Sequence, residues 1–133
     1  MRIEDIAIGQ ALPKLAIPIT VPLIAGGAIA TRDYFPGHHD LEAARALGSP
    51  HIFMNILTTS GLVQRFVEHW TGPEVEFKSV KIKLGAPNYP GDTMTFSGEV
   101  IALDTAAQVA EVKLAGANSM GHHVTGTVRV RLQ

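Results

Sequence analysis

The residues best suited to chemistry lie close together between Asp33 and Asp40, where the sequence reads Asp-Tyr-Phe-Pro-Gly-His-His-Asp. A carboxylate, Asp33, and an imidazole, His38, stand five residues apart, and the Pro-Gly pair between them favours a tight turn. On such a loop the two side chains could hold one water molecule and move its protons, which is general acid–base chemistry. Asp33 and His38 are therefore the candidate catalytic pair.

Each residue of this stretch also has a plain structural use, and the residues alone leave both uses open. Asp often caps a turn before Pro-Gly, and a single His is more often a loop residue than a catalyst. Asp40 is well placed as the N-cap of a helix over 41–47. A metal site built from His38, His39 and Asp40 is not expected, because adjacent side chains point apart and the sequence has no His-x-His or His-x-x-x-His spacing. We expect no metal, and we regard His39 as a structural residue that could lie beside the site.

The segments around this stretch predict the elements that must position it. Residues 12–20 combine β-branched residues with prolines, which is typical of an edge strand. Pro22 suits the first turn of a helix over 22–31, and Gly48 ends the short helix over 41–47.

The longest predicted helix spans residues 52–70. Apolar residues recur there at helical spacing, and Gly72-Pro73 closes the segment. We expect this helix to be covered by the β-strands that follow it.

The second half of the chain carries the signals of β-strands, which we place at residues 74–84, 93–103, 109–115 and 122–132. His122 and His123 begin the last of these, and we expect both on a solvated hairpin. Helices followed by consecutive strands indicate an α+β fold, with one antiparallel sheet wrapped around one long helix.

The composition limits the classes of protein that the chain can belong to. The chain has 133 residues, 46% of them hydrophobic and 17% charged, so we expect one globular domain over residues 1–133. A net charge of −1 gives no sign of a nucleic acid partner. The absence of Cys excludes disulfides and thiolate chemistry and fits a cytoplasmic protein. The apolar run 15–30 is interrupted by two prolines and two glycines and follows acidic residues, so we predict no membrane span and no secretory signal.

This order of elements resembles the hotdog fold, and the sequence resembles one family that has it. Asp33-x-x-Pro36-x-His38 is similar to the hydratase motif of the MaoC-like enoyl-CoA hydratases, whose common form is Asp-x-Asn-Pro-x-His. The likeness covers nearly the whole chain and is most specific to one subgroup, the small catalytic subunit of the actinobacterial steroid side-chain enoyl-CoA hydratase. The segments that carry it are 30–34, 38–40, 52–58, 61–65 and 95–100. Two residues depart from the wider family: Phe35 replaces the Asn of the motif, and Asn55 replaces the Gly that starts the long helix.

The resemblance implies a lyase that adds water to a 2-enoyl-CoA thioester and gives the 3-hydroxyacyl-CoA, as in cholesterol catabolism. It implies Asp33 as the main base and His38 as the residue that orients the water. The thioester oxygen would be stabilised at the start of the long helix, with the Asn55 N–H as donor and Ile56 beside it. Phe35 and His39 would be neighbours of the pair. Coenzyme A is part of the substrate, so no separate cofactor is expected.

The resemblance also implies a partner, a second MaoC-like subunit in a two-plus-two heterotetramer that supplies space for a bulky acyl group. A homodimer acting as a stand-alone (R)-specific enoyl-CoA hydratase on short or medium fatty acyl chains is the first alternative. An acyl-CoA thioesterase or an acyl-binding hotdog subunit is the second. Thioesterases of this fold place a carboxylate on the long helix, and residues 52–66 hold no Asp or Glu, which counts against that alternative.

Overall fold

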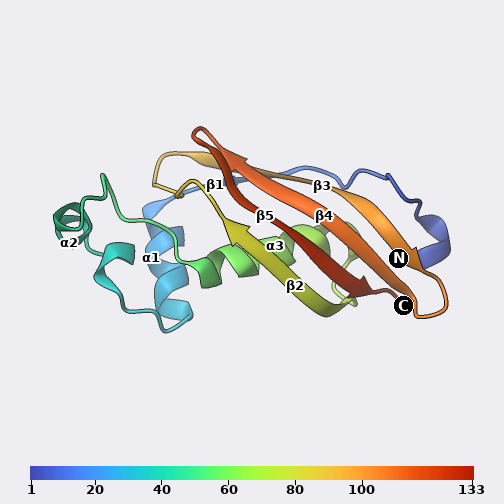
Figure 1. Ribbon diagram of the computed structural model, residues 1–133. Coiled ribbons are helices and arrows are strands. Elements are labelled where there is room, and N and C mark those ends of the chain that lie inside the picture. Colours follow the sequence, from blue (N-terminus) through green and yellow to red (C-terminus); the bar gives the residue numbers. More distant parts are fainter.

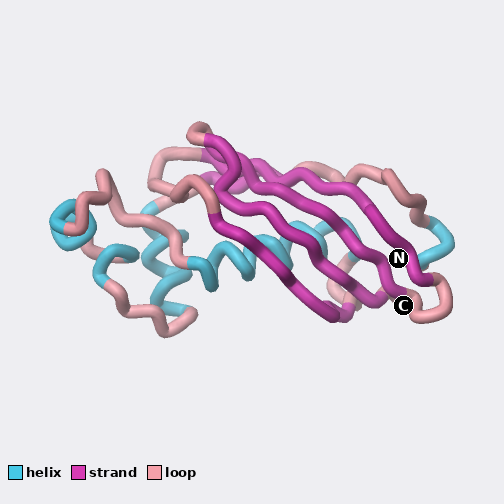
Figure 2. Tube along the Cα trace, viewed as in Figure 1, coloured by secondary structure: helices cyan, strands magenta, loops and turns pink.

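The computed structural model describes residues 1–133 as one five-stranded antiparallel sheet with a long helix against one of its faces (Figures 1 and 2). The elements in chain order are η1 (Ile3–Asp5), β1 (Leu15–Pro18), α1 (Val21–Ala30), η2 (Pro36–His38), α2 (Leu41–Ala46), α3 (Ile56–Thr71), β2 (Glu76–Leu84), β3 (Thr93–Asp104), β4 (Val109–Asn118) and β5 (Gly121–Arg131). This is the α+β hotdog arrangement that the sequence predicts.

The strands lie in the order β1-β3-β4-β5-β2, so that β3, β4 and β5 form a meander in the middle of the sheet. Val112 of β4 stands opposite Val100 of β3 on one side and Val128 of β5 on the other, and all three are buried. The predicted edge strand is confirmed in β1, where Pro18 lacks the N–H that an inner strand would need for both its neighbours.

The hydrophobic core is one cluster of 23 buried residues between the sheet and the inner face of α3. Val63, Phe66 and Val67 supply the helix side of this core. The Phe66 ring stacks on Phe96 of β3 with centroids 5.1 Å apart, and truncating such a ring to Ala typically costs about 3–5 kcal/mol. Burial of this face therefore fixes α3 against the sheet. None of the helices is long and apolar enough to cross a membrane.

The short elements α1, η2 and α2 gather at the end of the sheet where α3 begins (Figure 1). Helix α1 approaches α3 closely because Gly27 has no side chain: a Cβ at that position would lie 2.3 Å from Oγ1 of Thr58. The predicted helices over 22–31 and 41–47 are confirmed to within one residue at each end. The loop between α1 and α2, which contains η2, is thus held over the N-terminus of α3.

Two local predictions are wrong, and both errors have a physical cause. The long helix begins at Ile56 rather than at residue 52, because Asn55 has an extended backbone and caps the helix with its side chain; the N–H groups of the preceding residues Phe53 and Met54 bond instead to the carbonyls of Gly37 and Asn88. His123 lies inside the molecule with only 2% of its surface exposed, not on a solvated hairpin, because both ring nitrogens have partners there, the Ala86 carbonyl and the buried Thr59 hydroxyl.

Candidate active site

The C-terminus of α1 fixes the backbone of Asp33. The Asp33 N–H bonds to the Ala28 carbonyl at 2.9 Å and the Arg32 N–H bonds to the Ile29 carbonyl at 3.0 Å, which is the Schellman pattern of helix ends. Arg32 takes the left-handed position of this motif with φ at +58°, where Gly is the usual residue. Asp33 therefore leaves the helix in a defined direction.

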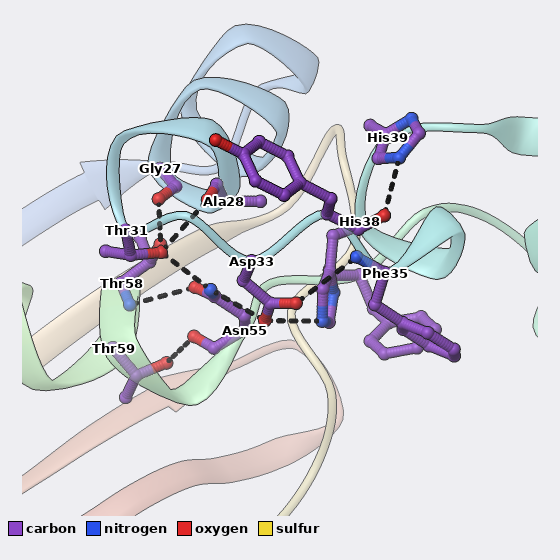
Figure 3. A network of polar contacts seen from close by, with 12 residues as sticks. Gly27, Ala28, Thr31, Asp33, Phe35, His38, His39, Asn55, Thr58 and Thr59 are labelled. Atoms are coloured by element: carbon purple, nitrogen blue, oxygen red, sulfur yellow. Dashed lines mark hydrogen bonds and ion pairs between the residues drawn. The ribbon is translucent and has the colours of Figure 1, made fainter.

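The Asp33 carboxylate lies between the start of α3 and η2 (Figure 3). Its Oδ2 accepts a hydrogen bond from Nδ2 of Asn55 at 3.0 Å, and its Oδ1 accepts one from the Phe35 N–H at 3.3 Å. Oδ2 is also 3.3 Å from Nε2 of His38. The Asn55 hydrogen bond lowers the pKa of Asp33 below its ordinary value of 3.8, with a smaller lowering from the Phe35 N–H. Asp33 is accordingly ionised at neutral pH.

The His38 ring presents one defined nitrogen to Asp33. Its Nδ1 lies 2.7 Å from the carbonyl oxygen of Phe53, and because a carbonyl can only accept, Nδ1 carries a hydrogen. In the neutral ring Nε2 then holds the lone pair, and in the charged ring it holds a proton that faces Oδ2 of Asp33. Nε2 is therefore the ring atom that can take up or release a proton at the site.

Aromatic rings enclose His38, whose side chain is only 9% exposed. The rings of Phe53 and Phe35 meet it edge-on, with centroids 4.9 and 5.4 Å away. A Cβ on Gly37 would lie 2.8 Å from the Phe53 ring and 2.9 Å from the Phe35 ring, so the enclosure requires glycine there. Phe35 itself is 46% exposed and forms the apolar rim of the site.

Asn55 joins the carboxylate to the start of α3. Its Oδ1 caps the helix by accepting from the Thr58 N–H at 2.9 Å, while Nδ2 donates to Oδ2 of Asp33 and to Oγ1 of Thr31, both at 3.0 Å. The side chain thus uses both hydrogens of its amide and is buried. The backbone N–H of Asn55 makes no hydrogen bond within the chain. It lies at the positive end of the α3 dipole.

The structure brings together some of the predicted site residues and separates others. Asp33 and His38 are adjacent, and the Asn55 side chain donates a hydrogen bond to Asp33. Ile56 is the first residue of α3 and is 50% exposed beside the site. His39 is directed away: its Nε2–H donates to the Tyr34 carbonyl at 3.2 Å, and it makes no contact with the carboxylate (Figure 3).

Asp40 caps α2 as predicted, since its Oδ1 accepts from the Ala43 N–H at 3.2 Å. No group of three or more His, Cys, Asp or Glu side chains is arranged to hold a metal ion.

Sequence reasoning missed two of the groups that build the site, the Asn55 side chain and the Phe53 carbonyl. The first had a usable signal, because Asn is among the preferred N-cap residues and stands before the apolar run of α3. The second is a backbone group in an irregular segment and leaves no trace in residue types.

The chain thus combines a hotdog sheet with an Asp–His pair on the loop over the start of its long helix. The family model described as "MaoC like domain" matches residues 5–119. The chain belongs to the MaoC-like family.

Two relatives are particularly similar. The chain is 45% identical over 126 residues to the 3-oxo-4,17-pregnadiene-20-carboxyl-CoA hydratase beta subunit of Mycobacterium tuberculosis, covering 95% of this chain and 96% of that one. The fold of the present chain matches one chain in the crystal structure of the ChsH1–ChsH2 complex from M. tuberculosis. The TM-score is 0.91 at 45% identity, over 96% of the present chain and 98% of the other. The (R)-hydratase of A. caviae shares the fold, with a TM-score of 0.89 at 20% identity over 98% and 99%.

Proposed function

We propose that the chain is an enoyl-CoA hydratase that converts a 2-enoyl-CoA thioester into the 3-hydroxyacyl-CoA, with Asp33 and His38 as its acid–base pair. The observation that carries this proposal is the 3.3 Å approach of Nε2 of His38 to Oδ2 of Asp33 at the start of α3. Membership of the MaoC-like family supports it.

The proposed reaction adds the elements of water across the double bond. Asp33 and Nε2 of His38 hold the water, and Asp33 takes its proton as the oxygen bonds to Cβ. The electron pair of the double bond moves toward Cα and the thioester oxygen. A proton returned from the pair to Cα completes the product. The low pKa of Asp33 keeps it in the basic form for the first step.

The developing negative charge on the thioester oxygen needs donors that are already in place. The Asn55 N–H is the candidate, because it has no partner in the chain and lies at the N-terminus of α3. Ile56 follows it and would contact the substrate beside this oxygen. Coenzyme A arrives as part of the substrate, so this chemistry calls on no further cofactor.

The proposed acyl group is bulky and apolar, of the steroid side-chain type. The relative at 45% identity carries a steroid acyl-CoA in its name, which supports this choice. The elements that form the site, which are the end of α1, the following loop and the start of α3, also carry exposed apolar side chains: Ile29, Tyr34, Phe35, Ile56 and Leu57. Phe35 in particular gives the rim an aromatic ring where the common motif has Asn.

The proposed assembly pairs the chain with a second MaoC-like subunit, in a two-plus-two heterotetramer. The likeness to a chain of the ChsH1–ChsH2 complex supports a partner of this kind. The apolar rim would then be covered by the partner and the acyl group together.

The test follows the loss of enoyl-thioester absorbance with the chain alone and with the MaoC-like subunit that co-purifies with it from the native host. Substrates are a steroid side-chain enoyl-CoA and a series of straight-chain enoyl-CoAs. Preference for the steroid substrate by the complex is the expected result. Activity of a homodimer on short or medium chains would contradict the proposed steroid substrate and the proposed partner. Inactivity of both preparations on all substrates would contradict the proposed hydratase activity.

A further inference from the structure

A buried histidine outside the Asp33–His38 pair links the sheet to the start of α3. His123 lies near the beginning of β5, at the end of the sheet where α3 also begins (Figure 1). Its Nδ1 is 2.7 Å from the carbonyl oxygen of Ala86, in the β2–β3 loop, and its Nε2 is 2.8 Å from Oγ1 of Thr59, in the first turn of α3. Thr59 is fully buried. No step of the proposed reaction uses these groups.

The Ala86 carbonyl determines which atom is the donor and which the acceptor in both hydrogen bonds of His123. The Ala86 carbonyl can only accept, so Nδ1 of His123 carries the hydrogen of the neutral ring. Nε2 is then an acceptor, and the Thr59 hydroxyl donates its single hydrogen to it at 2.8 Å. The Asn55 carbonyl oxygen, 3.3 Å from the same hydroxyl, is the more distant of its two acceptors. Burial lowers the pKa of His123, which favours this neutral ring.

The β2–β3 loop thereby holds the chain on both sides of Asn55. Before Asn55, the Met54 N–H bonds to the Asn88 carbonyl at 3.2 Å. After Asn55, the Thr59 hydroxyl reaches the same loop through His123. Asn55 lies between the two attachments and holds Oδ2 of Asp33.

We propose that His123 is a positioning residue of the active site: through Thr59 it fixes the first turn of α3, and with it the Asn55 amide and backbone N–H, relative to Asp33. This rests on the proposed hydratase function for its kinetic consequence, but its geometric consequence can be measured without activity. A loosened turn would move the Asn55 amide away from the carboxylate and the proposed oxyanion donor away from the thioester.

The decisive variant is Thr59→Val, which keeps the shape of the side chain and removes the donor to Nε2. We expect kcat to fall about tenfold, as small displacements of reacting groups do, with KM changed by less than about twofold. The pKa of Asp33, followed by carbon-13 NMR of its carboxyl, should rise as the Asn55 hydrogen bond weakens. Thr59→Ser keeps the hydroxyl and should restore both values.

Thr58→Val is the matched control. Thr58 is the preceding residue of the same turn and is also buried, but its hydroxyl has no hydrogen-bond partner. The control should keep kcat and the Asp33 pKa at wild-type values. If the loss of any buried Thr hydroxyl in this turn disturbed the structure, both variants would show the same change in kcat and in the Asp33 pKa.

The proposal is overturned if Thr59→Val keeps both kcat and the Asp33 pKa, or if Thr58→Val changes them equally. It is also overturned if nitrogen-15 NMR of the wild-type chain finds the hydrogen of His123 on Nε2. Should Thr59→Val fail to fold, Thr59→Cys, with its weaker donor, takes its place under the same expectations. If the wild type hydrates no enoyl-CoA, the proposed function fails, and the Asp33 pKa and the His123 tautomer still decide the positioning role.

Discussion

Nδ2 of Asn55 lies 3.0 Å from Oδ2 of Asp33, the same carboxylate oxygen that faces Nε2 of His38. The Asn55 side chain therefore performs two tasks: its amide oxygen caps α3, and its amide nitrogen donates a hydrogen bond to the Asp33 carboxylate. The start of the long helix and the charge state of Asp33 are coupled through this residue. The first prediction separates the two tasks.

Asn55→Ser keeps an N-cap oxygen but is too short to donate to Asp33. The Asp33 pKa, lowered first by Asn55, should rise toward 3.8, and the free energy of unfolding at pH 7 should fall because the ionised carboxylate loses this hydrogen bond, while the helix cap is kept. Carbon-13 NMR of the carboxyl and urea unfolding measure the two quantities. Asn55→Ala removes the cap as well and should lose about 1 kcal/mol of stability. An unchanged Asp33 pKa in both variants would contradict the assigned hydrogen bond.

The pKa of Asp33 also has a consequence for pH dependence. A folded-state pKa below the ordinary 3.8 means that Asp33 stabilises the fold above that pH and loses this contribution only as the pH falls through its folded value. Protonation of Asp33 should therefore cause no loss of activity between pH 7 and pH 5. If carbon-13 titration places the Asp33 pKa within that interval, this expectation is wrong.

Asp33→Asn should abolish most of the proposed hydration, because the new amide can still accept from the Phe35 N–H but cannot take a proton. We expect kcat to fall about 10²- to 10⁴-fold, the usual contribution of a general base, with the fold retained. The enoyl-thioester absorbance assay measures the rate, and far-UV circular dichroism checks the fold. Asp40→Asn is the matched control, since Asn also caps α2 well, and it should stay near the wild-type rate.

Gly27→Ala should destabilise the contact between α1 and α3, because the new Cβ would overlap Oγ1 of Thr58. We expect a loss of about 1–3 kcal/mol in the free energy of unfolding. Gly26→Ala, one residue earlier in the same helix, meets no atom within 4 Å and should gain up to about 1 kcal/mol from helix propensity. Adding Thr58→Ala to Gly27→Ala should recover part of the loss. Equal effects of the two Gly variants would refute the close approach.

His123 should make stability depend on pH. Its pKa in the fold is lowered below 6.5 by burial, so its contribution is fully present above pH 6.5. As the pH falls from 6.5 toward the folded value, the unfolded chain takes up a proton that the folded chain does not. The free energy of unfolding then falls by at most about 1.4 kcal/mol per pH unit from this residue.

Urea unfolding at pH 7.5 and 5.5 measures that difference, which His123→Gln should reduce. The exposed neighbour His122 provides the control, and His122→Gln should leave the difference as in the wild type. If both substitutions change the pH dependence equally, burial of His123 is not its cause.

The sequence predicts the parts of the molecule that depend on local residue types. Pro18 identifies an edge strand, Asp40 identifies a helix cap, and the five-residue spacing from Asp33 to His38 predicts two side chains that the structure brings to 3.3 Å. Apolar periodicity continues through residues 52 and 53 and so predicts too early a start for α3, whereas the extended backbone and side-chain cap of Asn55 begin the helix at Ile56. Thr59, which donates its hydroxyl hydrogen to His123, is 64 residues away along the chain, and no local pattern indicates that pairing.

The contacts of Asp33 have one more consequence. The backbone and side-chain bonds that hold Asp33 come from Ala28, Phe35, His38 and Asn55, so they belong to one uninterrupted stretch of chain. The supports of Asn55, in contrast, come from outside that stretch, from Asn88 in the β2–β3 loop and from His123 of β5 by way of Thr59. A change in the packing of the sheet would therefore reach Asp33 through the start of α3 and not by direct contact.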